Sequence, residues 1–294
     1  MTGPLYGLVE AGGTKFMLGI ATGKDDICET VRIPTTTPAE TIGAMVDWFA
    51  ARGPLVGLGV ASFGPLDLDP GSPSFGSITR TPKPHWSNAD LVGPLRAALD
   101  CPVGIDTDVN GAALAEYLWG AAQGQRIALY FTIGTGIGGG AVIDGQPIRG
   151  LSHPEMGHVR VSRHPDDLDF AGICPFHGDC LEGLASGPAI MARWGKSLSD
   201  LPVDHPGHAI IAHYLAQLVT SMQAIFEPGK IVLGGGVTST LGLIERVRTE
   251  ATRLGGDYFR SNAEAIVSLP SLGDKSGLLG ALALAMRAGP RSTS

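Results

Sequence analysis

The sequence predicts an α/β fold made of two related halves that face one another. Three observations carry this prediction: a hairpin with a glycine-rich tip occurs twice, each hairpin is followed further on by a buried strand that leads into a turn of small residues, and amphipathic helices lie between the strands. Strands that alternate with helices are typical of α/β domains. Repetition of one plan within a chain indicates duplicated halves.

The hairpins span residues 5–23, LYGLVEAGGTKFMLGIATG, and residues 128–145, ALYFTIGTGIGGGAVIDG. In each, two apolar runs flank a tip that is Gly12-Gly13-Thr14 in the first and Gly134-Thr135-Gly136 in the second. Glycine lets the backbone approach a ligand closely, so the two tips are suited to present amides and threonine hydroxyls to a phosphate chain. The later buried strands are predicted at 55–60, which ends in ASFGP, and at 230–233, which ends in GGGV.

The helices follow from the spacing of apolar residues. The first begins with a capping box from Thr37 to Glu40, with Pro38 at the first helical position. Further helices are predicted at 110–122, 209–226 and 276–287.

The domain boundaries depend on the last of these helices. Because an apolar helix at the end of the chain is expected to pack back onto the first half, we predict an N-terminal domain of residues 1–113 plus 275–294. The C-terminal domain is then predicted to span residues 114–274.

Charge and hydropathy argue against two classes of partner, nucleic acids and membranes. The chain has 294 residues, a formal net charge of −7 and a pI near 5.6, and without a run of basic residues it argues against a nucleic-acid partner. The start of the chain lacks the basic and apolar regions of a signal peptide, and the uncharged stretch 127–142 is short and broken by five glycines. We therefore expect a cytoplasmic protein with no membrane partner.

The segment 152–188 gathers residues that bind metals. It contains His158 and a C-x2-H-x2-C pattern formed by Cys174, His177 and Cys180. Zinc favours four thiolate or imidazole ligands in a tetrahedron, and closely spaced ligands joined by a longer loop to a fourth are its usual arrangement. We therefore predict a structural zinc site with these four ligands.

Two other histidines leave one ligand open, because His153 and His164 are each close enough in sequence to replace His158. Four protein ligands leave no open position for water, so the ion is expected to fold the loop and not to act as a Lewis acid. A loop held in this way would fix Glu155, His158 and Glu182 at set separations, which recognition of a polyhydroxylated ligand requires.

Between the hairpins, the stretch VGIDTDVNGAALAE places Asp108 where a strand is followed by a helix. Open α/β sheets usually carry their active groups at this position. Taken alone, Asp108 fits a plain helix N-cap equally well, since Asp is a favoured capping residue. Asp106 is expected to be a supporting hydrogen-bond acceptor.

Five motifs, in this order, resemble those of the ROK family (repressors, open reading frames and sugar kinases) of the actin-like, hexokinase-type phosphotransferase superfamily. EAGGTKF is similar to the first phosphate motif, TDVNGAALAE to the catalytic-aspartate motif and FTIGTGIGGG to the second phosphate motif. HPEMGH with CPFHGDCLEG resembles the sugar-and-zinc signature, and KIVLGGGV resembles the adenosine motif. The match covers nearly the whole chain and implies an actin-like ATPase fold, a duplicated ribonuclease H-like fold with two α/β domains flanking an active-site cleft.

The resemblance implies transfer of the γ-phosphoryl group of Mg-ATP to a sugar hydroxyl, which Asp108 would orient and deprotonate. It implies that the sugar is held by Glu155, His158, Glu182, Gly64, Pro65 and Thr107. It implies that the nucleotide is held by Gly12, Gly13, Thr14, Lys15, Gly134, Thr135, Gly136, Gly138, Gly139, Gly234, Gly235 and Gly236. Glu10 is expected to position Mg2+ through water.

Within the family the chain most resembles the zinc-containing bacterial fructokinases. Glu10 replaces the more usual aspartate, TPKPHW occupies residues 81–86, and His177 stands where other members have a cysteine. This branch implies ATP-dependent phosphorylation of D-fructose at the 6-hydroxyl, by a homodimer. Thr107 stands where many hexose-specific members have a sugar-contacting asparagine, which weakens the case for glucose.

Two alternatives stay open. One is a kinase for mannose, glucose or an N-acetylhexosamine. The other is a non-enzymatic ROK-type sugar sensor, but such members carry a DNA-binding segment before the first phosphate motif, whereas EAGGTK begins here at residue 10 and the chain is acidic.

Overall fold

The computed structural model describes residues 3–256 and 258–289, which form two compact units. Unit 1 comprises the residues up to Ala115, the segment Ile148–His153 and the residues from Gly273 on, and unit 2 comprises Glu116–Pro147 and Pro154–Leu272. Residues 1, 2, 257 and 290–294 of the predicted domains lie outside the described part of the chain.

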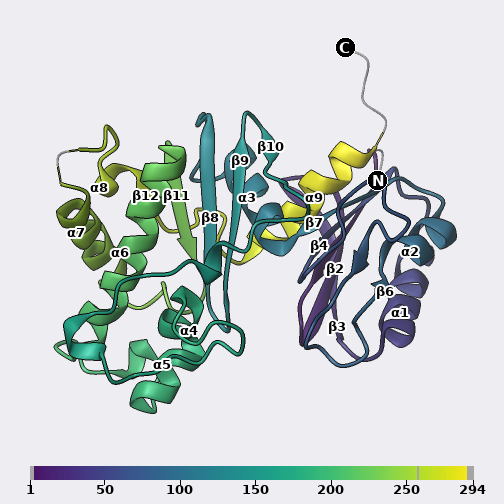
Figure 1. Ribbon diagram of the computed structural model, residues 1–294. Helices are drawn as coiled ribbons and strands as arrows, with labels where there is room; N and C mark the ends of the chain where they lie inside the picture. The colour runs from purple at the N-terminus through teal and green to yellow at the C-terminus, as the bar shows by residue number, and fades with distance from the viewer. Residues whose placement is uncertain (1–2, 257, 290–294) are drawn as a thin grey trace. The chain divides into compact units, whose positions relative to one another are not determined.

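Unit 1 is built on a five-stranded sheet in the order β3-β2-β1-β4-β7 (Figure 1). β1, β2 and β3 are antiparallel neighbours, whereas β4 and β7 continue the sheet in parallel with β1. The strands are β1 (Tyr6–Ala11), β2 (Lys15–Gly23), β3 (Asp26–Pro34), β4 (Gly57–Ser62), β7 (Val103–Thr107) and the short pair β5 (Ser77–Ile78) and β6 (Ala89–Asp90). The helices are α1 (Pro38–Ala50), α2 (Val92–Leu99), the first two turns of α3 (Asp108–Trp119), the 3-10 turn η4 (Gly273–Lys275) and α9 (Ser276–Ala288).

The predicted capping box at the start of α1 is confirmed. The Thr37 hydroxyl accepts a hydrogen bond from the Glu40 amide at 3.4 Å, and the Glu40 carboxylate accepts one from the Thr37 amide at 3.4 Å. The helix then buries Met45 and Phe49 in the same core as the fully buried Trp86. Helix α1 is therefore fixed both by local capping and by apolar burial against the sheet.

Helix α9 packs on the strands β1, β4 and β7 by close backbone approach. A Cβ atom at Gly59 of β4 would overlap the backbone of Ala281, and one at Gly104 of β7 would crowd the carbonyl of Leu284. Glycine at these strand positions removes the side chain where the helix must come closest. The expectation that the last helix packs onto the first half rests on its apolar composition, and these glycines supply the place for it.

The segment Ile148–His153 groups with unit 1, whereas the predicted C-terminal domain of residues 114–274 included it. Arg149 forms an ion pair with the buried Asp106 at 2.9 Å, and His153 Nε2 accepts a hydrogen bond from the Leu66 amide at 3.0 Å. Both partners belong to unit 1, and neither contact follows a sequence-local rule.

Unit 2 has a five-stranded sheet in the order β10-β9-β8-β11-β12. β8, β9 and β10 are antiparallel, and β11 and β12 run parallel to β8. The strands are β8 (Ile127–Ile133), β9 (Ile137–Ile143), β10 (Gln146–Pro147), β11 (Lys230–Gly234) and β12 (Val267–Ser268). The helices are α4 (Leu181–Ala185), α5 (Gly187–Trp194), α6 (Gly207–Phe226), α7 (Leu243–Gly255) and α8 (Ala263–Ile266), with 3-10 turns η1 (Met156–His158), η2 (Pro165–Asp167) and η3 (Leu198–Asp200).

The two sheets share one plan, in which three antiparallel strands are followed by two parallel ones. The duplication inferred from the glycine-tipped hairpins is therefore confirmed at the level of strand order. It places the first tip between β1 and β2 and the second tip between β8 and β9, at corresponding points of the two units.

Helix α3 begins and ends earlier than predicted, at Asp108 and Trp119. It stops because the carboxylate of the buried Glu116 accepts a hydrogen bond from the Ala121 amide at 2.7 Å, and the chain turns there. The same carboxylate accepts hydrogen bonds from the amides of Ser271 at 3.2 Å and Leu272 at 3.1 Å. A glutamate inside the motif therefore ends the helix and anchors a loop.

Helix α6 is long and apolar enough to cross a membrane by length and composition, but 56% of its most apolar window is buried inside the structure. A core helix passes the same test, and α6 packs against α7 and α4 in unit 2. Its apolar character is therefore accounted for by packing.

Candidate active site

The first glycine-rich tip joins β1 to β2 in unit 1. The Gly12 amide donates to the Lys15 carbonyl at 3.0 Å and closes the turn. Thr35, at the end of β3, donates from its hydroxyl to the Gly12 carbonyl at 2.8 Å and from its amide to the Thr14 carbonyl at 3.1 Å. Gly13, Thr14 and Lys15 are exposed. The tip is thus held from below while its outer side is open to solvent.

Glu10 lies on β1 immediately before this tip. Burial raises the pKa of its carboxyl, and the positive charge of Lys15 lowers it in part. Gly277, at the start of α9, has no side chain where one would overlap the Glu10 carboxylate. The carboxyl group is therefore held in a confined, partly buried position beside the first glycine-rich tip.

The junction of β7 and α3 positions Asp108. The Thr107 hydroxyl accepts a hydrogen bond from the Asn110 amide at 3.1 Å, which makes Thr107 the residue that caps the helix. Asp108 lies in the first helical turn, half-buried, with Oδ1 accepting a hydrogen bond from the Val109 amide at 2.9 Å. Asp108 therefore occupies the first helical position after the capping residue. A carboxylate at a helix N-terminus is also favoured in its ionised form.

Asp106 supports this junction from inside the sheet. Its side chain is fully buried, and its Oδ1 accepts hydrogen bonds from the Thr107 amide at 2.8 Å and the Asn110 side chain at 2.7 Å. Its Oδ2 pairs with Arg149 at 2.9 Å. A buried charge needs such partners, and Arg149 was not found from the sequence because it lies 43 residues away.

Gly64 and Pro65 follow β4 in unit 1 and are joined by a cis peptide bond. The Pro65 carbonyl accepts a hydrogen bond from the Thr79 amide at 2.7 Å. The next residue, Leu66, donates its amide to His153 Nε2, which engages that histidine away from the predicted metal site.

The second glycine-rich tip joins β8 to β9 in unit 2 and is tied to the loop that follows the metal cluster. The Gly134 amide donates to the Gly136 carbonyl at 2.9 Å, and the Gly134 carbonyl accepts from the Gly187 amide at 2.8 Å. Glu182, in the first turn of α4, accepts a hydrogen bond from the Ile137 amide at 2.9 Å. Glu182 is therefore not a solvated surface residue: its carboxylate holds the tip.

The predicted phosphate ligands Gly138 and Gly139 lie in β9 and not at the tip. Gly139 is buried, and a Cβ atom there would overlap Phe131 and Met156. Gly157, in η1, likewise has no side chain where one would overlap the Ile137 carbonyl. These glycines pack the η1 turn onto the hairpin, which brings the segment from Glu155 to His158 next to the tip.

Four side chains in unit 2 form the predicted metal cluster, and their ligand atoms all lie within 4.8 Å of one another: His158, Cys174, His177 and Cys180. His158 Nδ1 lies 3.4 Å from Cys180 Sγ and 3.8 Å from Cys174 Sγ, and His177 Nδ1 lies 3.7 Å from Cys174 Sγ. Zn–S bonds of about 2.3 Å and Zn–N bonds of about 2.0–2.1 Å in a tetrahedron separate nitrogen and sulfur by roughly 3.6 Å. The four residues therefore fit a zinc ion in both chemistry and spacing.

The competing histidine His164 lies outside this cluster. Its Nδ1 accepts a hydrogen bond from the Asp166 amide at 3.1 Å, and its ring packs against His213. Glu155, whose carbonyl accepts from the His158 amide at 3.1 Å, is exposed just before the cluster. The structure therefore fits His158, and not His164, as the fourth metal ligand.

A buried polar network fastens the metal loop to the rest of unit 2. Asp167 pairs with Arg193 of α5 at 2.9 Å and accepts a hydrogen bond from the Tyr214 hydroxyl of α6 at 2.7 Å. Burial lowers the pKa of Arg193, and the neighbouring Asp167 partly offsets this. This network was not predicted from the sequence, because no local pattern distinguishes Asp167 from the neighbouring aspartates and its partners are distant along the chain.

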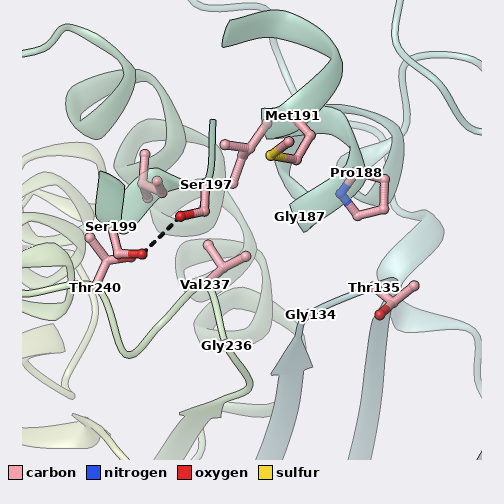
Figure 2. A pocket seen from close by; sticks show the side chains of 12 residues that line it. Gly134, Thr135, Gly187, Pro188, Met191, Ser197, Ser199, Gly236, Val237 and Thr240 are labelled. Atoms are coloured by element: carbon pink, nitrogen blue, oxygen red, sulfur yellow. Dashed lines mark hydrogen bonds between the residues drawn. The ribbon is translucent and has the colours of Figure 1, made fainter. Parts of the chain in front are cut away.

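A pocket of about 760 Å³ opens beside the second tip in unit 2. Figure 2 shows Gly134 and Thr135 on one side of it and Ser199 and Thr240 on the opposite side, with Met191 and Val237 between. Its walls come from the tip, from α5, from η3 and from the turn after β11. Of the predicted nucleotide ligands, Gly134, Thr135 and Gly236 line it, whereas Gly234 is buried beneath Tyr130. The walls from α5 and η3 were not predicted, because they carry no glycine-rich signature.

Each unit thus brings together part of the predicted site. In unit 1 the tip at Gly12–Thr14 follows Glu10, and Asp108 begins a neighbouring helix. In unit 2 the second tip, Glu182 and the metal cluster form one bonded assembly beside the pocket.

Two units of one topology, each with a glycine-rich hairpin tip, define the class of actin-like phosphotransferases. The chain belongs to the ROK family, whose model matches residues 6–288. It is 50% identical to a fructokinase of Zymomonas mobilis over 97% of each chain.

Solved structures agree with this assignment. The ROK hexokinase of Thermus thermophilus matches with a TM-score of 0.79 and 28% identity, covering 96% of this chain and 98% of that one. A ROK family glucokinase of Streptomyces griseus, solved in complex with glucose and AMPPNP, matches with a TM-score of 0.73 and 26% identity, covering 96% and 99%.

Proposed function

We propose that the protein transfers the γ-phosphoryl group of ATP to the 6-hydroxyl of D-fructose. The observation that carries this proposal is the 50% identity to a fructokinase along 97% of both chains, which includes residues of both units. Membership of the ROK family, together with fructokinase relatives at 40–50% identity, makes the protein a sugar kinase.

The pocket in unit 2 is the proposed nucleotide site. Its volume of about 760 Å³ falls within the usual range for cofactor-sized ligands. The exposed turn at Gly134 and Thr135 borders it and would receive the phosphates, while the apolar side chains of Met191 and Val237 flank the space for the base (Figure 2). The AMPPNP complex of the related glucokinase supports a nucleotide in proteins of this fold.

The first tip in unit 1 would bind the phosphate being transferred. Gly12, Gly13 and Thr14 supply backbone donors, and Lys15 supplies a positive charge. A Mg2+ ion held near this tip would supply positive charge that offsets the charge developing during transfer. Glu10, confined beside the tip, is the proposed carboxylate that orients the waters around that ion.

Asp108 is the proposed catalytic base. Thr107 supplies the capping oxygen of α3, and the carboxylate of Asp108 lies at the strand-to-helix junction where open sheets carry reactive groups. In phosphoryl transfer such an Asp accepts the hydroxyl proton and orients the nucleophile. Glu155, His158 and Glu182 in unit 2, with Thr107, Gly64 and Pro65 in unit 1, are the proposed sugar ligands.

The four-residue cluster is the proposed zinc site. The donor set is complete with two thiolates and two imidazoles, so the ion would hold the loop and take no part in the reaction. Through Cys180 and the adjoining α4 it would also fix Glu182, and with it the second tip. We further infer that the protein is cytoplasmic. From the family resemblance we also infer a homodimer, and sedimentation of the purified protein tests this oligomeric state.

A sugar panel tests the proposal. Purified protein is assayed with Mg-ATP and fructose, mannose, glucose or an N-acetylhexosamine, with ADP release as the readout. We expect the highest kcat/KM for fructose. A higher value for another sugar would make that sugar the substrate, and sugar binding without turnover would favour a sensor.

A further inference from the structure

The end of the pocket opposite the phosphate-binding tip is lined by residues that carry hydroxyl groups. Ser197, Ser199 and Thr240 lie there, away from Gly134 and Thr135 (Figure 2). The nucleotide phosphates belong at the glycine-rich tip, so this far end is where the edge of the base would lie.

Two hydrogen bonds set the direction in which the Ser197 and Ser199 hydroxyls point. The Ser197 hydroxyl donates to Asp200 Oδ2 at 2.6 Å. The Ser197 and Ser199 oxygens are also hydrogen-bonded to each other at 2.9 Å, the contact drawn in Figure 2. A serine hydroxyl has one proton. Because Ser197 gives its proton to the Asp200 carboxylate, Ser199 must donate to Ser197. Ser199 then faces a ligand as an acceptor.

Thr240 lies at the same end of the pocket. The residue is 6% exposed, and its hydroxyl oxygen is buried with no hydrogen-bond partner among the described residues. The oxygen therefore lies behind the surface of the pocket, although Thr240 is one of the lining residues.

We propose that Ser199, oriented by Ser197 and Asp200, selects adenine over 6-oxopurines by accepting a hydrogen bond from the 6-amino group. Adenine carries a donor at this position, whereas hypoxanthine and guanine carry a carbonyl oxygen. That oxygen would meet the lone pairs of Ser199, and an acceptor facing an acceptor rejects the wrong base. The inference rests on the proposed function, because it takes this pocket as the nucleotide site.

Calorimetric titration of the whole protein with ADP and with IDP tests the proposal. The two ligands differ only in the base, and neither needs a sugar or turnover. We expect wild-type protein to bind ADP more tightly than IDP by about two- to tenfold, the range that one exposed hydrogen bond supports. Ser199→Ala is expected to weaken ADP binding and bring the ratio close to one.

Asp200→Ala is expected to change mainly the affinity for IDP. Without the carboxylate, Ser197 can donate to Ser199, which frees the Ser199 proton for the carbonyl of hypoxanthine. IDP should then bind about two- to fivefold more tightly than to wild type, while ADP binding falls little. Ser239→Ala is the matched control, because the Ser239 hydroxyl bonds the nearby Gly236 carbonyl at 2.7 Å and is not part of the lining.

The proposal is overturned if ADP does not bind, or if the ratio of ADP to IDP affinity is the same in wild type, Ser199→Ala and Asp200→Ala. Failure of the proposed function is a separate result, seen as ADP binding with no phosphorylation of fructose. Melting temperatures of all variants establish that each is folded.

Discussion

Asp108 begins α3, but the capping hydrogen bond of that helix comes from Thr107. Asp108→Asn should therefore leave the melting temperature nearly unchanged, because an amide oxygen can still accept from the Val109 amide. Turnover of fructose should fall by on the order of a hundredfold or more, since an amide cannot accept the proton, and ATP affinity should barely move. A variant that keeps a near wild-type rate would remove Asp108 from the mechanism.

Glu10 gives a prediction that depends on pH. Burial raises the pKa of its carboxyl in the folded state above the pKa in the unfolded chain. Folding stability therefore begins to fall when the pH rises past the unfolded-state pKa, and the full loss is reached above the folded-state pKa. Glu10→Gln should therefore raise the melting temperature at pH 7 while lowering Mg2+-dependent turnover. The gain in stability should shrink as the pH falls towards 4, where the carboxyl is mostly protonated in both states.

Glu29→Gln is the control for Glu10→Gln, because the pKa of Glu29 is shifted in the opposite direction. The hydrogen bond from Arg52 lowers the pKa of its exposed carboxyl, so Glu29→Gln should not stabilise the protein at pH 7. Thermal melts between pH 4 and pH 8 of the three proteins make the comparison. A melting temperature of Glu10→Gln below that of wild type at pH 7 would contradict this account of the carboxyl.

The close packing of α9 on β4 is the clearest case at the scale of elements. Gly59→Ala would insert a methyl group into the backbone of Ala281, and we expect a loss of about 1–3 kcal/mol in the free energy of unfolding. Gly43→Ala, in α1, meets no atom within 4 Å and should stabilise by about 0.5–1 kcal/mol. Urea unfolding of both variants measures the difference, and equal effects would show that the approach of α9 is not tight.

The loop with the four metal-ligand candidates and the second glycine-rich tip are joined through α4. Cys180 immediately precedes this helix, and Glu182 in its first turn holds the Ile137 amide. We predict about one zinc per chain, with Cys180→Ser losing metal and binding ADP several-fold more weakly because the tip loses its support. Cys28→Ser, at an exposed residue of unit 1, should change neither. Elemental analysis showing no zinc in the wild type, or unchanged ADP affinity in Cys180→Ser, would contradict the linkage.

The sequence predicts elements whose signals are local. The capping box of α1, both hairpin tips and the ligand spacing of the metal loop lie within short stretches, and the structure contains each of them. The features that were missed depend on distant partners. Arg149 meets Asp106 across 43 residues, and Tyr214 meets Asp167 across 47. No local pattern marks such pairs, which is why no signal in the sequence indicated that Ile148–His153 groups with unit 1.

At the scale of the whole molecule, duplication explains how function is divided. Unit 1 carries Asp108, Glu10 and one tip, and unit 2 carries the other tip, the pocket and the metal cluster. The repeated hairpins made this duplication visible in the sequence. The pocket was only partly predictable, because α5 and η3 contribute side chains of ordinary type whose role depends on where the chain places them.

The identity of the product tests the central claim most directly. Purified protein is incubated with Mg-ATP and fructose labelled with carbon-13, and phosphorus and carbon NMR follow the position of the phosphate. The account predicts fructose 6-phosphate and ADP in equal amounts, with Asp108→Asn forming neither at a comparable rate. Phosphate at another hydroxyl, or ADP formed without any phosphosugar, would contradict it.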